Sequence, residues 1–239
     1  MNKFINIYGI HAAIHALLNK SRVIKKVYLT ENAKRKIDIS TEIDLSKFDF
    51  EINNTKQLNS LLPSGSIHQG IIVKANQKET LSLNEIEYSA IKTIVILDQI
   101  LDPRNFGAIL RVCAAFRTGH IIITKQFANF DEGLIAKAAS GGIEYVNIIE
   151  VKNLSNAIEK IKKYGFWVCG LDGNASQTIG DINSNEKNAL VFGEEGKGMR
   201  LLTKKKCDNL YSINTTGEIE SLNVSMAAGI VLQVISNRN

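Results

Sequence analysis

Three short polar segments hold the residues of this chain whose types and spacing could do chemistry. An asparagine and an arginine follow one apolar run, a glutamate stands between glycines after a second, and a serine and an asparagine open the last predicted helix. These residues are Asn105, Arg111, Glu195, Ser221 and Asn223. A guanidinium binds phosphate or carboxylate groups, and amide and carboxylate groups can fix its orientation through hydrogen bonds. We therefore interpret the three segments as parts of one site.

The first segment is predicted to begin a helix at about residues 105–117. Pro103 favours extended backbone at the residue before it, and Asn105 is a favoured N-cap. Apolar residues from 109 to 116 then recur at i, i+3, i+4 and i+7, which places one stripe against the core. Arg111 lies about 200° around the helix from the start of that stripe. We expect its guanidinium to point away from the core near a helix end that favours anions, with an ordinary exposed arginine as the alternative.

The second segment is the glycine-rich stretch 193–198, which follows the apolar run 189–192. It is expected at the carboxyl end of a strand, where open α/β sheets bind ligands. It matches neither the phosphate-binding pattern G-x-x-x-x-G-K-[ST] nor the dinucleotide pattern G-x-G-x-x-G, so nucleotide hydrolysis and ordinary dinucleotide binding are disfavoured. Glu195 is either a solvated turn residue or a carboxylate that orients Arg111.

The third segment opens the last predicted helix, at residues 222–236. Ser221 is a candidate N-cap. Two rows of apolar residues run along this helix, one of them formed by Leu222, Met226, Ile230 and Val234. A helix that is apolar on two sides is buried in its own domain or against a second subunit. We expect a homodimer, since symmetric dimers are common, and a core helix in a monomer is the alternative.

The elements that must position these segments alternate along the chain. Strands are expected at residues 94–97, 120–124, 145–149, 166–171, 188–192 and 210–213, and helices at about 105–117, 131–139, 153–164 and 222–236. This alternation predicts an α/β fold with a mostly parallel sheet covered by helices.

A small mixed α/β domain is predicted to precede that sheet, over residues 1–76. It contains a short helix at 7–18 and strands at 26–30 and 67–74. The polar stretch that follows predicts a linker at 77–90, and the second domain spans 91–239.

Composition excludes several classes of protein. The 239 residues are 44% hydrophobic and 22% charged, which is enough to bury one large core or two modest ones. No apolar run approaches the roughly 20 residues of a membrane-spanning helix, and the first residues lack a secretory signal, so we expect a cytoplasmic protein without membrane contact. The net charge of +5 fits an anionic partner.

The cysteines and histidines indicate neither a disulfide nor a metal site. The three cysteines are widely separated, without a C-x-x-C pair. His11 and His15 are four residues apart on a predicted helix, as metal ligands can be, but no third ligand accompanies them. Capping or packing is the favoured interpretation of these two histidines.

In combination, the three segments resemble the ordered motifs of the SpoU-TrmH family of RNA 2′-O-ribose methyltransferases. The residues that carry the resemblance are Asn105-x-Gly107-x-x-x-Arg111, Gly193-x-Glu195-x-x-Gly198 and Ser221-Leu222-Asn223-Val224. It extends to Ser140-Gly141-Gly142-x-Glu144, Cys207-Asp208, Tyr8-Gly9-Ile10-His11 and His68-Gln69-Gly70. The last two patterns are similar to the two-domain branch that modifies guanosine in 23S ribosomal RNA.

The resemblance implies a fold and a cofactor that the residue patterns alone do not. It implies a trefoil-knotted, SPOUT-type sheet preceded by an RNA-binding α/β domain, and S-adenosylmethionine as the methyl donor. Position by position, it points to Gly193, Ile213 and Leu222 as donor-binding residues that act mainly through their backbone groups. No metal is implied.

The resemblance also implies roles for the polar residues. The family assigns proton removal to the arginine that matches Arg111. Because a guanidinium has a pKa above about 12, we expect Arg111 to bind an RNA phosphate and the developing alkoxide, while the phosphate or a water accepts the proton. Asn105, Glu195 and Asn223 are expected to orient it. Ser221 is expected to cap or position, because no histidine base accompanies it.

Three other readings of the chain stay open from the sequence. A transfer-RNA ribose 2′-O-methyltransferase, or a resistance enzyme acting on another ribosomal RNA site, would keep the same three motifs. A non-catalytic RNA-binding member of the family would be expected to lose Asn105, Arg111 or Asn223, all of which are present here. Only mapping of the modified nucleotide distinguishes the transfer-RNA enzyme and the resistance enzyme from an enzyme that modifies guanosine in 23S ribosomal RNA.

Overall fold

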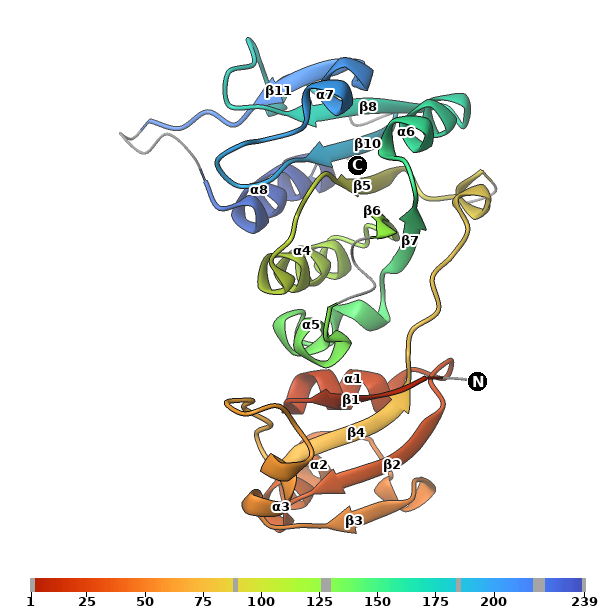
Figure 1. Cartoon of the computed structure of the whole chain (residues 1–239), viewed down its shortest axis with the longest axis vertical. Helices are drawn as coiled ribbons and strands as arrows, with labels where there is room; N and C mark the ends of the chain where they lie inside the picture. Colours follow the sequence, from red (N-terminus) through yellow and green to blue (C-terminus); the bar gives the residue numbers. More distant parts are fainter. Residues whose placement is uncertain (1–2, 88–89, 126–129, 184–185, 217–221, 238–239) are drawn as a thin grey trace.

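Two β-sheets organise the protein, in a computed structural model that describes residues 3–87, 90–125, 130–183, 186–216 and 222–237 (Figure 1). The smaller sheet has four strands in the order β1-β4-β2-β3, and the larger sheet has seven in the order β7-β6-β5-β10-β8-β11-β9. The predicted α/β class, with a mostly parallel sheet and a small N-terminal domain, is confirmed.

The smaller sheet is built around its longest central strands. Its strands are β1 (Phe4–Tyr8), β2 (Ile24–Leu29), β3 (Phe50–Ile52) and β4 (Ile71–Asn76). Its helices are α1 (Ile10–Leu18), α2 (Glu31–Ser40) and α3 (Thr55–Ser60). Strand β4 pairs antiparallel with both β1 and β2, and β2 pairs parallel with β3.

The predicted helix over residues 7–18 is wrong at its start. Ile7 and Tyr8 belong to β1, where Ile5 and Ile7 alternate with Asn6 in the two-residue period of a strand. Gly9 has a φ of 93°, which favours glycine, and it turns the chain from β1 into α1. The strands predicted at 26–30 and 67–74 occur at 24–29 and 71–76, and β1, β3, α2 and α3 had not been predicted.

The larger sheet contains every strand that the alternating pattern predicted. Its strands are β5 (Thr93–Leu97), β6 (His120–Thr124), β7 (Asn147–Val151), β8 (Phe166–Leu171), β9 (Gln177–Thr178), β10 (Lys187–Phe192) and β11 (Asn209–Ser212). Every pairing recorded between neighbouring strands of this sheet is parallel. Strand β7 begins two residues later than predicted, because residues 142–144 form a 3-10 turn.

Alternate side chains of these strands pack against different helices. Val95 and Leu97 of β5 belong to a core cluster with residues of α4 (Pro103–Ala115), α5 (Glu132–Ala138) and α8 (Val224–Ser236). Ile94 and Ile96 belong to a second cluster, with α6 (Leu154–Lys163). The two-residue period of a strand therefore gives each face of the sheet its own helical layer.

Two helix starts differ from those predicted. Asp102, not Asn105, is the N-cap of α4, and its side chain accepts a hydrogen bond from the backbone N–H of Arg104 at 2.8 Å. Pro103 occupies the first helical turn, where its missing N–H costs nothing. At the last helix, Asn223 caps α8, and the predicted cap Ser221 lies outside the described residues. Asn105 thus keeps its amide available for other contacts.

A buried ion cluster joins the smaller domain to helix α5 and to the 3-10 turn at residues 142–144. Arg22 follows α1, and its Nη2 lies 3.0 Å from Oε1 of Glu132 and 2.9 Å from Oε1 of Glu144. Its Nη1 also donates to the backbone carbonyl of Asn76 at 2.6 Å. The three charged side chains are 2%, 10% and 1% exposed. Removal of a single partner would leave charge buried without compensation.

Residues 77–87 of the predicted linker, 77–90, pack on the larger domain. Leu81 forms a parallel bridge with Ile149, and Ile86 is completely buried in a 3-10 turn, Leu83–Ile86. Lys78 approaches the ion cluster, and its Nζ donates to the carbonyl of Ile143. Burial lowers the pKa of Lys78 to about 8 from its ordinary 10.5, against the opposing attraction of Glu144.

Lys78 predicts a pH dependence of stability. Because the folded pKa lies below the unfolded one, the unfolded chain binds more protons between about pH 8 and pH 10.5, and the free energy of unfolding rises through that window. Urea unfolding at pH 7.5 and pH 10 should show wild type gaining about 2 kcal/mol relative to Lys78→Met. The same comparison for Lys20→Met, which removes an exposed lysine, is the control. An unchanged difference for Lys78→Met would contradict the prediction.

Candidate active site

Three of the predicted site residues meet in one hydrogen-bonded group, which we call the polar trio: Asn105, Glu195 and Asn223. The side-chain Nδ2 of Asn223 donates to Oδ1 of Asn105 at 3.0 Å and to Oε2 of Glu195 at 3.0 Å. Its Oδ1 accepts from the backbone N–H and the hydroxyl of Ser225, at 2.9 and 2.6 Å. These contacts satisfy the Asn223 amide and fix its orientation.

The polar trio still offers groups to a ligand. Within the described residues, neither Nδ2 of Asn105 nor Oε1 of Glu195 takes part in a hydrogen bond, and the Glu195 side chain is exposed. The trio therefore presents an amide donor and a carboxylate acceptor at fixed positions. Such a pair can hold a sugar hydroxyl or a base edge.

A cavity of about 850 Å³ lies at the carboxyl ends of β8, β10 and β11. Gly193, Ile213 and Leu222, the three predicted donor-binding residues, all line it, and so does Glu195 of the polar trio. Its wall also includes apolar side chains such as Phe192 and Val224. Position, size and lining are those of a small-ligand site in an open α/β sheet.

The glycine-rich loop closes tightly over this cavity. Glu194 and Gly198 exchange backbone hydrogen bonds of 3.1 and 2.8 Å across it, and Gly198 has a φ of 68°. A Cβ on Gly193 would lie 2.2 Å from the backbone of Gly198 and Met199. Only glycine fits at position 193 without displacing the loop.

Asp98 holds the far end of the same loop, and the sequence reasoning missed it. This carboxylate is completely buried. Its oxygens accept hydrogen bonds from the backbone N–H of Arg200 at 2.9 Å and from Nε of Arg200 at 2.7 Å. The backbone N–H of Asp98 donates to the carbonyl of Phe192 at 2.8 Å. The sequence does show an acidic residue directly after the apolar strand 94–97. A carboxylate at such a buried position needs a charged or hydrogen-bonding partner, so this residue could have been identified as a structural contact.

Arg111 lies away from the polar trio. On α4 it follows Asn105 by six residues, a rise of about 9 Å with a rotation of about 240°. The described part of the chain shows no hydrogen bond between Arg111 and any member of the trio. The expectation that Arg111 lies near a helix start is wrong, because α4 begins at Pro103, two turns earlier. Within the described residues of one chain, no hydrogen bond therefore supports the hypothesis that the polar trio orients Arg111.

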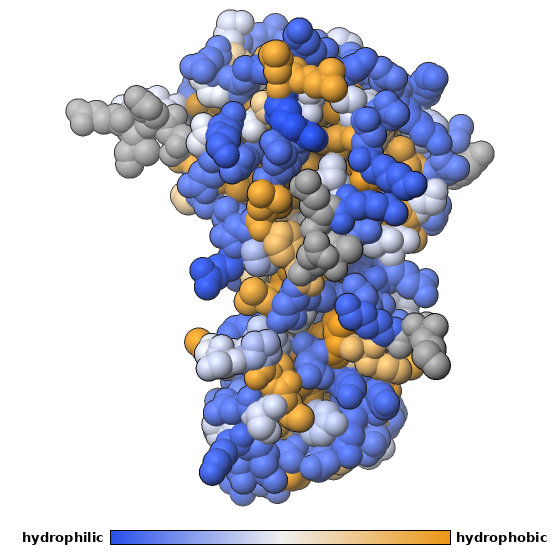
Figure 2. Space-filling view, in the orientation of Figure 1, coloured by the Kyte–Doolittle hydropathy of each residue, from blue (hydrophilic) through white to orange (hydrophobic). Residues whose placement is uncertain are grey.

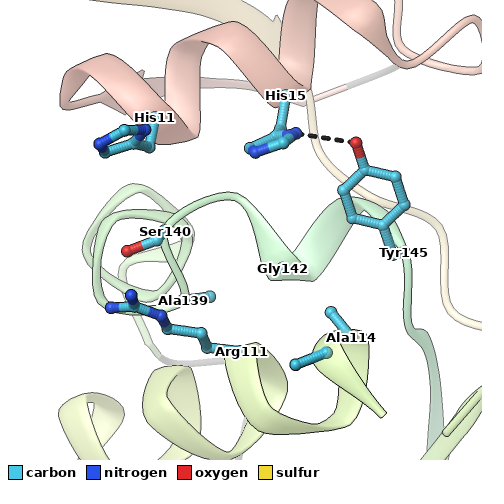
Figure 3. A pocket seen from close by; sticks show the side chains of 9 residues that line it. His11, His15, Arg111, Ala114, Ala139, Ser140, Gly142 and Tyr145 are labelled. Carbon is cyan, nitrogen blue, oxygen red and sulfur yellow. Dashed lines mark hydrogen bonds between the residues drawn. The ribbon is translucent and has the colours of Figure 1, made fainter. Parts of the chain in front are cut away.

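Arg111 instead lines a second cavity, of about 450 Å³, together with residues of the smaller domain (Figure 3). His11 and His15 of α1 face this cavity from the opposite side, and Ser140 lies between. The Arg111 side chain is exposed. A guanidinium in such a position is free to bind a phosphate.

Two kinds of feature are absent from the described residues. Their His, Cys, Asp and Glu side chains form no group of three or more that could hold a metal ion, and none of their helices has the length and apolar character of a membrane span. The three cysteines are free thiols, and burial raises the pKa of each to about 12. At neutral pH they are therefore protonated and weakly nucleophilic.

The fold and the site define an α/β protein with a cavity of small-ligand size at the carboxyl edge of a parallel sheet and a second domain over an exposed arginine. Residues 92–233 match the SpoU rRNA Methylase family, and residues 6–81 match the RNA 2'-O ribose methyltransferase substrate binding family. The chain belongs to the SpoU rRNA methylase family, whose members are RNA methyltransferases.

Similar proteins extend over the whole chain. A 23S rRNA (guanosine-2'-O-)-methyltransferase RlmB from Coxiella burnetii is 34% identical, with 100% of this chain and 97% of that protein covered. The protein of the same name from Pseudomonas aeruginosa is 29% identical over 97% of this chain and 96% of its own. An AdoMet-bound rRNA methyltransferase from Sinorhizobium meliloti has the same fold, with a TM-score of 0.78 at 21% identity over 98% of this chain and 87% of that one.

Proposed function

We propose that the protein transfers the methyl group of S-adenosylmethionine to the 2′-hydroxyl of a guanosine ribose in 23S ribosomal RNA. The observation that carries the proposal is the meeting of three distant segments in one polar trio beside a cavity of small-ligand size. Family membership supports the reaction class, and the full-length relatives favour guanosine in ribosomal RNA as the substrate.

The cavity fits S-adenosylmethionine in size and in chemistry. A volume of about 850 Å³ falls within the range of clefts that enclose small cofactors. The side chains of Phe192, Ile213 and Leu222 offer apolar cover for an adenine ring. The glycine-rich loop brings backbone N–H and C=O groups close to the ligand, because Gly193 has no side chain to keep them away. We assign Gly193, Ile213 and Leu222 to donor binding.

The chain's residues need to position the substrate and ease the loss of one proton. The bound donor supplies a methyl group that is already activated on a sulfonium centre. A guanidinium does not act as a base in proteins, so we assign Arg111 to an RNA phosphate next to the target ribose, where its charge also favours the alkoxide that develops. The proton passes to that phosphate or to a water. Asn105, Glu195 and Asn223 hold the ribose in line with the methyl group.

RNA reaches both sites if it follows helix α4. Asn105 and Arg111 lie about 9 Å apart along that helix, so one strand can contact the polar trio and the guanidinium together. Hydrophilic side chains cover most of the face in Figure 2, and the chain's net charge is +5. Such a charge attracts nucleic acid. Ser221, which lies outside the described residues, keeps its assignment as a positioning residue.

We further propose that the protein acts as a cytoplasmic homodimer with a trefoil-knotted larger domain. Helix α8 supports the dimer, because Met226 and Ile230 are 59% and 37% exposed on a helix whose opposite face is buried. An apolar row of this kind is stabilised when a second subunit covers it. The knot follows from the family resemblance. The domain limits 1–76, 77–90 and 91–239 are retained in this proposal.

The close approach at Gly193 predicts a selective loss of donor binding. Gly193→Ala forces the loop apart, because its Cβ would lie 2.2 Å from backbone atoms. We expect calorimetry to show S-adenosylmethionine binding weakened at least about tenfold. Gly173→Ala is the matched control: Gly173 lines the same cavity, but a Cβ there meets nothing within 4 Å. Equal affinity in the two variants would contradict the role of the loop.

The proposal is tested by transfer of labelled methyl from S-adenosylmethionine to unmodified ribosomal and transfer RNA. Mapping of alkali-resistant 2′-O-methyl nucleotides then locates the product. Label at one guanosine of 23S ribosomal RNA is expected. Label only in transfer RNA would keep the reaction and overturn the substrate, and donor binding without any transfer would favour a non-catalytic RNA-binding protein.

A further inference from the structure

The cavity of about 450 Å³ is formed jointly by the two domains, and its residues are of kinds that bind nucleic acid. Helix α1 of the smaller domain contributes His11 and His15, one helical turn apart, and helix α4 of the larger domain contributes Arg111 (Figure 3). The floor between them is the loop at Ser140 and Gly142. Neither domain alone contains this set of side chains.

Two adjacent glycines set the distance between the two walls. A Cβ on Gly141 would lie 2.5 to 2.7 Å from the side chain of His15, and Gly141 has a φ of 84°. A Cβ on Gly142 would lie 2.9 Å from Cα of Arg111. The loop is therefore packed directly between His15 and Arg111, and a larger residue at either glycine would push the walls apart.

The ion cluster holds the same arrangement from the other side. Glu144 follows the loop by two residues, and its carboxylate accepts hydrogen bonds from Arg22 and from Nδ2 of Asn19 at 2.6 Å. Both donors come from the segment directly after α1. The position of α1 over α4 is thus fixed at several buried contacts, as a preformed binding site requires.

The side chains around the cavity retain unused hydrogen-bonding groups. Nδ1 of His15 shares a 2.7 Å hydrogen bond with the Tyr145 hydroxyl, and the two rings pack edge to face. Within the described residues, Nε2 of His15, the His11 ring and the Arg111 guanidinium have no hydrogen-bond partner. Burial, with a smaller effect from His11, lowers the pKa of His15, so this ring is neutral at pH 7 and acts by hydrogen bonding.

We propose that this cavity is a nucleotide subsite for the RNA substrate, in which Arg111 binds a backbone phosphate and His11 and His15 of the smaller domain hydrogen-bond to the same nucleotide. The inference rests on the proposed function and deepens it. The smaller domain then does more than retain RNA near the enzyme, because it supplies part of the surface that positions the target strand. A single-stranded segment fits this role, since its nucleotides are free to enter a cavity.

The histidine rings provide a direct test that does not depend on turnover. With ¹⁵N-labelled histidine, NMR should show the ring resonances of His11 and His15 shifting when a short guanosine-containing single-stranded RNA is added. Buried His68 and His120 are internal controls and should not shift. His11→Ala, at an exposed position, is expected to weaken binding of that RNA about fivefold to tenfold. Arg35→Ala, on the exposed face of α2, should change it less than about twofold.

The outcomes separate this inference from the proposed function. No shift of His11 and His15 on adding the RNA, or an identical shift in Arg111→Ala, would overturn the subsite. Methyl transfer measured on the same preparation decides the rest. Transfer without histidine shifts refutes the subsite and keeps the reaction, whereas histidine shifts without transfer to any RNA keep the subsite and refute the reaction.

Discussion

Replacement of Arg111 by alanine is expected to slow methyl transfer about a hundredfold to a thousandfold, the range lost when one group that stabilises developing charge is removed. Binding of S-adenosylmethionine should remain nearly unchanged, because Arg111 does not line the donor cavity. The side chain is exposed and makes no ion pair within the described residues, so its removal leaves no buried charge. Single-turnover transfer of labelled methyl and calorimetry of donor binding measure the two effects separately.

Arg111→Lys distinguishes charge from geometry at this position. Lysine keeps the positive charge and loses the planar fork that binds phosphate in two places. We expect it to recover only a small part of the lost rate. Full recovery would show that charge alone matters, and wild-type turnover in Arg111→Ala would remove Arg111 from the mechanism.

The larger sheet could be predicted well because its signal is local. Each strand is a short apolar run, and each helix has a repeat of three to four residues, so the order of elements followed directly from the chain. In the smaller domain the signal is weaker. Strand β1 runs into helix α1 through one residue, Gly9, and an apolar stretch across that boundary resembles a single helix. Helix ends were harder to predict, because two neighbouring residues can both be good N-caps. At α4 the candidates are Asp102 and Asn105, and Asp102 is the N-cap.

The candidate site was predictable in its residue types but not in its arrangement. Three motifs at the carboxyl ends of strands indicated that Asn105, Glu195 and Asn223 share one site, because parallel strands end at the same edge. The separation of Arg111 from them depends on where α4 begins and on how α1 packs over it. The role of Asp98 depends on its distance from Arg200, and residues 102 apart in sequence leave no local pattern.

The buried ion cluster carries the second large prediction. Arg22→Met leaves Glu132 and Glu144 buried without their cation, a change expected to cost about 3 to 5 kcal/mol in the free energy of unfolding. Burial already raises the pKa of Glu132 despite the attraction of Arg22, so loss of the arginine favours its protonated form further. Urea unfolding followed by fluorescence of Trp167 measures the effect. Lys26→Met, which breaks the more exposed ion pair with Glu51, is the control and should change stability little.

A compensated variant separates the charge effect from simple loss of packing. Arg22→Met combined with Glu132→Gln removes one cation and one anion and leaves Lys78 with Glu144, so most of the lost stability should return. If the double variant is as unstable as Arg22→Met, the cluster acts through shape and not through charge. The same variants report on the domain interface: Arg22→Met should weaken RNA binding along with stability, because the cavity between α1 and α4 depends on the position that Arg22 and Glu144 fix.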